Sequence, residues 1–146
     1  MDIIGQLVTS FIATAAFGVI FNAPKETLVK CGLVGMGGWI IYYIAEKYSG
    51  DPVLATLGAT LFVGIVSQEL AKFYKTPVII FSVAGIIPLV PGGLAYDTMR
   101  NFVEDDYFQA IALGAKVTLL SGSIAFGLVF SEVINQLVRK IKGVKI

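Results

Sequence analysis

Residues 85–93 read Gly85-Ile86-Ile87-Pro88-Leu89-Val90-Pro91-Gly92-Gly93 and lie inside a mainly apolar segment, residues 77–102. That segment is long enough to cross a bilayer, which takes about 20 residues of helix. Hydrocarbon contains no water, so a backbone group that loses its helical partner there must be satisfied by protein or by a wet cavity. Pro88 and Pro91 lack an N–H and disfavour helical angles in the residues before them. The stretch therefore predicts a membrane helix that is broken between Pro88 and Gly93.

The depth and direction of this break suggest a binding site. Counted from Thr76, the helix rise puts Pro88 about 18 Å into a hydrocarbon core of about 30 Å, near or just beyond its midplane. Gly92 and Gly93 permit backbone angles that other residues avoid. A helix that resumes at about Gly92 directs free N–H groups into the membrane, which suits a carboxylate, and secondary transporters build sites in this way. The alternative is a simple proline kink that neighbouring helices relieve.

The composition is that of a membrane protein. The chain has 146 residues, of which 56% are hydrophobic and only 14% are charged, and its mean hydropathy is +0.82. By both measures the chain is far more apolar than a soluble domain. Five apolar segments predict an all-α polytopic protein that forms a single transmembrane domain over residues 1–146, because the connections are too short for extramembrane domains. The expected spans are about 3–21, 28–45, 53–71, 77–102 (broken) and 108–138.

Several classes of function are excluded by what the sequence lacks. There is no His and one Cys, so no zinc or haem constellation is expected, and no cofactor or metal. The chain has no Gly-x-Ser-x-Gly elbow, no phosphate-binding lysine loop and no clustered metal-ligating carboxylates. We therefore expect no enzymatic activity. The formal net charge of +1 is uninformative as a total, because in a membrane protein the positions of the charges matter. The sequence shows no nucleic-acid footprint.

The basic residues predict the orientation in the membrane. If the N-terminus is outside, Lys47 and Arg100 fall on the outer side and eight other basic residues fall on the inner side. The positive side of a membrane protein is normally cytoplasmic. We therefore expect a multi-pass protein of the cell membrane with its N-terminus outside and its C-terminus in the cytoplasm. The eight inner residues are Lys25, Lys30, Lys72, Lys75, Arg139, Lys140, Lys142 and Lys145.

Two charged residues within the expected spans are candidates for function. Lys116 lies eight residues into the last segment, and ionisable groups at such depth are functional suspects by default. Its partner is either a substrate anion or Asp97, which follows Gly93 by four residues and is the candidate for proton coupling. The alternatives are snorkelling of Lys116 to the outer interface, and capping by Asp97 or an ion pair between Asp97 and Arg100.

Other polar and small residues have more ordinary interpretations. Glu69 precedes Lys72 by three residues, which predicts a surface ion pair. Nothing in the sequence distinguishes Trp39 from an interface residue. Small or hydroxyl residues at every fourth position predict close helix packing. These faces are Ser10, Thr14 and Gly18; Thr56, Thr60 and Gly64; and Ala110, Gly114, Thr118 and Gly122. A glycine cluster, Gly32, Gly35, Gly37 and Gly38, is either a pliable region or a second close contact.

The motif Pro88-Leu-Val-Pro-Gly-Gly93, followed by Tyr96, in the fourth of five spans resembles the threonine/serine exporter family, and most of the chain is similar to its small subunit, the C-terminal five-helix half. The resemblance implies proton-coupled export of small amino acids such as threonine and serine, and related two-subunit pairs are associated with dicarboxylates such as succinate. It implies a larger membrane partner that resembles the N-terminal half. The substrate-binding residues it suggests are Pro88, Pro91, Gly92, Gly93 and Tyr96, to which the residue chemistry adds Lys116.

Two other functions remain open from the sequence. The chain could be an assembly subunit that stabilises a separate transporter without binding substrate, in which case the prolines only shape a packed bundle. It could also form a homo-oligomeric channel, which the small-residue faces permit.

Overall fold

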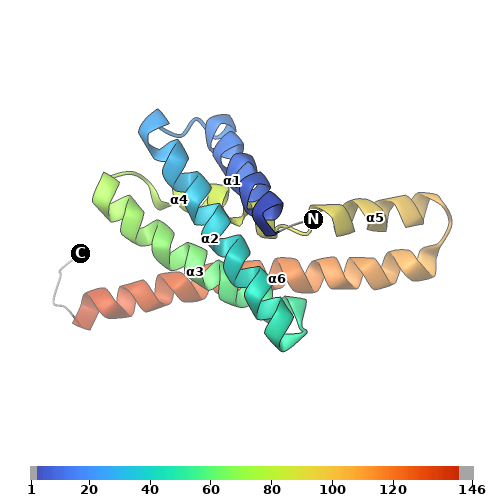
Figure 1. The fold of residues 1–146 in the computed structure, drawn as a ribbon. Coiled ribbons are helices and arrows are strands. Elements are labelled where there is room, and N and C mark those ends of the chain that lie inside the picture. Colours follow the sequence, from blue (N-terminus) through green and yellow to red (C-terminus); the bar gives the residue numbers. More distant parts are fainter. Residues whose placement is uncertain (1–2, 142–146) are drawn as a thin grey trace.

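The computed structural model describes residues 3–141, which fold into helices joined by short turns (Figure 1). The helices are α1 (Ile3–Ile20), α2 (Lys25–Ser49), α3 (Pro52–Tyr74), α4 (Val78–Ile86), the short 3-10 helix η1 (Ile87–Leu89), α5 (Gly92–Val103) and α6 (Tyr107–Ile141). Four of them are long and apolar enough to cross a membrane, and α4 with η1 and α5 forms a bent pair that can make a fifth span. The expected all-α polytopic fold, with its fourth span broken, is confirmed.

Local sequence signals fix the tight connection between α2 and α3. Gly50 ends α2 in the left-handed region with a φ of 68°, and its N–H donates to Glu46 O. Asp51 then caps α3 by accepting a hydrogen bond from the Val53 N–H at 2.8 Å, and Pro52 occupies the first helical position. These are the preferred residues at a helix end and a helix start. The short connection makes α2 and α3 antiparallel neighbours.

The glycine cluster of α2 serves close packing. A Cβ at Gly35 would lie 2.0 Å from Thr14 Oγ1 of α1, and one at Gly38 would lie 2.6 Å from a Val63 methyl of α3. Such approaches leave no room for a side chain at these glycines, so the Thr14 and Val63 side chains pack directly on the backbone of α2. Small residues at helix contacts are common in membranes. The first two small-residue faces expected from the sequence are buried. Their members are Ser10, Thr14, Gly18, Thr56, Thr60 and Gly64.

The second half of α6 packs against α3 in the same way, with hydroxyl side chains against glycines. A Cβ at Gly127 would lie 2.0 Å from Thr60 Oγ1. A Cβ at Gly64 would lie 2.1 Å from Ser131 Oγ, and the Ser123 hydroxyl donates to Val53 O at 2.8 Å. The core of the molecule therefore lies between α3, its neighbours α2 and α4, and the second half of α6.

The first half of α6 leaves this bundle together with α5. Figure 1 shows the two helices projecting as an antiparallel hairpin; we call α5 and residues 107–119 of α6 the arm. No residue of α5 is buried, and α5 packs mainly against α6. The third expected small-residue face is therefore only partly covered: Ala110 is buried, whereas Thr118 is exposed.

Candidate functional site

The break between α4 and α5 is built by its prolines. The chain bends by 55° between Val78–Leu89 and Gly92–Val103. Pro88 lies within η1, Val90 is extended with φ −66° and ψ 128°, and Pro91 precedes the first residue of α5. The bend predicted between Pro88 and Gly93 is present, and α5 restarts at Gly92 as expected.

The start of α5 leaves backbone donors free. Pro91 provides no side-chain cap, while the Gly92 N–H donates to Val90 O and the Ala95 N–H to Pro91 O. The N–H groups of Gly93 and Leu94 belong to the first turn, where an α-helix offers no acceptor. This helix end therefore has hydrogen-bonding capacity for an anion.

Gly92 and Gly93 are not needed for the bend. Neither has a positive φ, because Gly50 is the only glycine among residues 3–141 whose backbone is in the left-handed region. This corrects the expectation that these glycines supply unusual backbone angles. A Cβ added at either position would meet no heavy atom within 4 Å. Their effect is to keep open space beside the free N–H groups.

Two cavities flank the break, and both are lined by Trp39 and Pro88. The first is an open, mainly apolar hollow of about 350 Å³, which we call the polar cavity after the Gln6, Thr9 and Ser10 side chains in its wall. The second, which we call the break cavity, has a volume of about 200 Å³. The other residues of the polar cavity are Gln6, Thr9, Ser10 and Ala13, and those of the break cavity are Tyr42, Thr56, Leu89, Val90, Pro91, Leu94 and Leu120. None of the lining residues is Asp, Glu, Lys or Arg.

The Trp39 side chain is held in a defined position between these cavities. Its indole Nε1–H donates to Gln6 Oε1 of α1 at 3.2 Å. Its ring lies against Tyr42, with 5.3 Å between the ring centroids, and the Tyr42 hydroxyl hydrogen-bonds to the Glu46 carboxylate. Sequence reasoning missed Gln6, Tyr42 and Glu46. The available signal was that Trp39 is the single Trp of the chain and follows a glycine cluster.

The residues expected to bind substrate divide into two groups. Pro88 lines both cavities and Pro91 lines the break cavity. The remaining residues line neither of them. Tyr96, Asp97 and Lys116 are exposed on the arm, and Gly92 and Gly93 are exposed at its base.

The charged residues of the arm form neither of the pairs considered from the sequence, Lys116 with Asp97 or Asp97 with Arg100. Arg100 Nε lies 2.9 Å from Glu104 Oε1, so it pairs with a residue one turn later and not with Asp97. The ion pairs among the described residues include neither Asp97 nor Lys116. Both side chains are therefore available to a substrate or to another protein.

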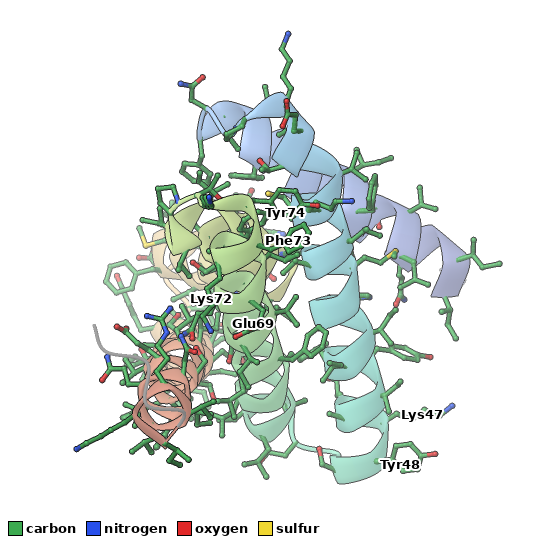
Figure 2. The ribbon with its side chains drawn as sticks, turned by 90° about the vertical axis from the view of Figure 1, so that its left-hand side faces the viewer. Lys47, Tyr48, Glu69, Lys72, Phe73 and Tyr74 are labelled. Atoms are coloured by element: carbon green, nitrogen blue, oxygen red, sulfur yellow. The ribbon has the colours of Figure 1, made fainter. Side chains whose placement is uncertain are left out.

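The other expected ion pair forms away from the cavities. Lys72 pairs with Glu69 on α3 and also donates to Asn135 Oδ1 of α6 at 2.8 Å. Figure 2 shows this pair near one end of α3, whereas Lys47 and Tyr48 lie at the opposite end of the bundle. The hydrogen bond from Lys72 to Asn135 ties α3 to α6, as a structural contact does.

Comparisons with known proteins identify the chain's relatives. A family model described as Threonine/Serine exporter, ThrE, matches residues 6–134. A Corynebacterium glutamicum protein named threonine/serine exporter is 29% identical over 135 residues, which cover 92% of this chain and 27% of that protein. An uncharacterised Haemophilus influenzae protein is 26% identical over 136 residues, which cover 88% of this chain and 46% of that protein.

No solved structure matches this chain. The chain spans less than half the length of these two relatives. The family model, however, covers most of the chain and includes the whole of the break and both cavities. The chain therefore belongs to the threonine/serine exporter family.

Proposed function

We propose that the chain is one subunit of a two-component secondary transporter that exports small carboxylate-bearing metabolites. The candidates are amino acids of the threonine/serine type, as the name of the Corynebacterium glutamicum relative suggests, or dicarboxylates such as succinate. The observation that carries this proposal is the broken span, whose break is flanked by two cavities. Broken helices with sites at mid-membrane depth are typical of secondary transporters.

The substrate binds at the break in this proposal. The free N–H groups of Gly93 and Leu94 provide donors for a carboxylate, and Leu94 itself lines the break cavity. Trp39 and Pro88 separate this cavity from the polar cavity. Lys116 and Tyr96 lie outside the cavities on the arm, so they serve substrate entry or the completed site in the two-component assembly.

The second component is a larger membrane subunit that resembles the N-terminal half of the family. Two features support such a partner. The relatives extend well beyond the region that matches this chain. The arm exposes Asp97 and Lys116 together with large apolar side chains, and charged groups facing lipid are costly, by about 3 kcal/mol for a central Lys. A partner that covers the arm would remove this cost.

Proton coupling requires a carboxylate that can change its protonation state. Asp97 is the residue we assign to this role, and Glu46 is a second candidate because its carboxylate is half-buried and contacts Tyr42 of the break cavity.

The proposed topology places the N-terminus outside and the C-terminus in the cytoplasm, by the distribution of basic residues.

Reconstitution in liposomes tests this proposal. The chain alone, the larger subunit alone and the two together are compared for movement of labelled threonine, serine and succinate under an imposed proton gradient. We expect coupled transport only from the pair. Full activity from the larger subunit alone would favour an assembly role, and gradient-independent flux through the present chain alone would favour a channel.

A further inference from the structure

We infer that the protein binds an anionic phospholipid between the first half of α1 and the second half of α2, with an acyl chain in an apolar groove and the phosphate beside Lys47. The groove, which we call the lipid groove, has a volume of about 220 Å³, and its exposed wall is entirely apolar. Ile3 and Leu7 line it from α1, and Ile40 and Ile44 line it from α2. This inference goes beyond the proposed function and does not depend on it.

The wall of the lipid groove decides the kind of occupant. A polar ligand would find no hydrogen-bond partner on an apolar wall, and unpaired polar groups are costly away from water. The groove is also open to the outside of the helix bundle, because Ile3 is 54% exposed and Ile44 is 48% exposed. A hydrocarbon chain that enters from the bilayer satisfies both conditions.

The depth of the groove corresponds to that of an acyl chain in one leaflet. The α2 side of the groove, residues 39–44, lies about 8–15 Å before the end of α2 at Ser49, counted by the helix rise. One leaflet contributes about half of a hydrocarbon core of about 30 Å. With the end of α2 at the interface, the groove spans the depth at which lipid chains lie, and the residues beyond it reach the headgroups.

Lys47 provides the charge for a headgroup at this end of the groove. It follows Ile40 and Tyr43 at helical spacing, so the three residues share one face of α2. Figure 2 shows Lys47 extending from the end of α2 on the side on which α1 lies. Lys47 is exposed, and the ion pairs within residues 3–141 do not include it. Its ammonium group is therefore available to a lipid phosphate.

The surrounding groups favour an anionic headgroup over a zwitterionic one. The two carboxylates nearest in sequence have other partners, since Glu46 contacts Tyr42 and Asp51 caps α3. The Tyr43 hydroxyl, one turn before Lys47, has no hydrogen-bond partner in the described part of the chain. A phosphate can accept hydrogen bonds from both groups. The cation of a choline or ethanolamine headgroup would be repelled by Lys47, so phosphatidylglycerol is the better match.

The lipid groove shares part of its wall with the space beside the break. Gln6 and Trp39 line the lipid groove and also the polar cavity, and the Trp39 Nε1–H donates to Gln6 Oε1 at 3.2 Å. An acyl chain in the groove therefore packs against two residues of the polar cavity and supports their contact from the lipid side. Because Trp39 is the single Trp of the chain, its fluorescence reports on the occupancy of the groove.

Quenching of Trp39 fluorescence by brominated lipid tests the inference. The full chain is reconstituted in phosphatidylcholine nanodiscs that contain increasing amounts of brominated phosphatidylglycerol or brominated phosphatidylcholine. The bromine lies towards the ends of the acyl chains and quenches an indole only at short range, so quenching requires a chain beside Trp39. We expect half-maximal quenching at a mole fraction roughly fivefold lower for phosphatidylglycerol, because Lys47 attracts the anionic lipid.

Two variants at exposed residues separate the headgroup from the chain. Lys47→Met keeps the length of the side chain but removes its charge. It should raise the mole fraction for phosphatidylglycerol to that for phosphatidylcholine and leave the latter unchanged. Ile44→Asn places an amide in the apolar wall, so it should raise both mole fractions and keep the preference. The control is Lys25→Met, the same exchange at the opposite end of α2, which should behave as the wild type.

The inference is overturned by equal mole fractions for the two lipids in the wild type, or by a preference that persists in Lys47→Met. An equal loss of preference in Lys25→Met would also overturn it, because total charge alone would then attract the lipid. Quenching that rises in proportion to either lipid without saturation would show bulk bilayer contact and no site. Transport enters none of these measurements, so each of these results leaves the proposed function unchanged.

Discussion

Trp39 is the residue on which the two cavities converge. It lines both of them and is the single Trp of the chain. Its indole therefore reports directly on whatever enters the space beside the break. From the sequence alone it is interpreted as an interface residue, because tryptophan at a membrane interface is common, and its contact with Gln6 joins residues 33 positions apart.

We expect Trp39 fluorescence to respond to substrate. The difference between the emission of the wild-type complex and that of the Trp39→Phe complex isolates this indole from any tryptophan of the partner. Adding threonine should shift or quench the difference spectrum in a saturable way, because the ligand displaces water beside the ring. A difference spectrum unchanged at concentrations that saturate transport would place the substrate elsewhere.

At the base of the arm, substitutions of Gly92 and Gly93 should affect stability and transport differently. Because neither needs a positive φ and a Cβ would meet open space, Gly92→Ala and Gly93→Ala should preserve or raise stability by about 0.4–1 kcal/mol. Transport should nevertheless fall, since each methyl group would occupy space beside the free N–H groups. Thermal unfolding in detergent and liposome transport measure the two effects.

The matched control for these glycines is Gly58→Ala in α3, where a Cβ also meets nothing within 4 Å. This variant should keep wild-type transport. Wild-type rates in Gly92→Ala and Gly93→Ala would instead mean that the break is only a proline kink.

At the scale of the elements, glycines at helix contacts determine how closely α3 and α6 pack. Gly127→Ala would place a methyl group 2.0 Å from Thr60 Oγ1 and 3.1 Å from Leu57 O. Overpacking of this kind typically destabilises by about 1–3 kcal/mol, so the midpoint of thermal unfolding in detergent should fall. Gly122→Ala, on the same helix with open space at its Cβ, should leave the midpoint unchanged or raise it. Equal midpoints for the two variants would contradict the packing described here.

The elements themselves could be largely predicted from the sequence, and the site only in part. Apolar length and the ring chemistry of Pro88 and Pro91 act locally, so the helices and the break follow from them. The polar cavity arises where α1, α2 and η1 meet, and no periodic pattern encodes that meeting. The open space around Gly92 and Gly93 could not be predicted for the same reason, because it depends on which helices lie nearby.

At the scale of the whole molecule, the arm is the surface that the rest of the chain leaves uncovered. Phe108 is 86% exposed on the arm, which also carries the exposed Ile111 and Phe102. Helix α5 has no buried residue at all. A hairpin with this surface and with exposed charges is suited to contact another membrane protein rather than lipid alone.

Photo-crosslinking should identify the partner's docking surface. With p-benzoylphenylalanine in place of Phe108, we expect light-dependent adducts with the larger subunit. The control position is Phe126, on the same helix but in the bundle, where the side chain is 64% exposed and should face lipid. Adducts from Phe126 and none from Phe108 would exclude the arm as the docking surface. An adduct at twice the mass of this chain would indicate a second copy instead.

The continuity of α6 has a mechanical consequence. Its 35 residues form a rod of about 52 Å that belongs to the arm at one end and contacts α3 at the other. A rigid rod transmits rotation, so a partner that grips the arm and tilts would swing the opposite end of α6 across α3, with the close contact at Gly127 as the pivot. The helix would then act as a lever that couples movement between two proteins to the opening of the space beside Trp39.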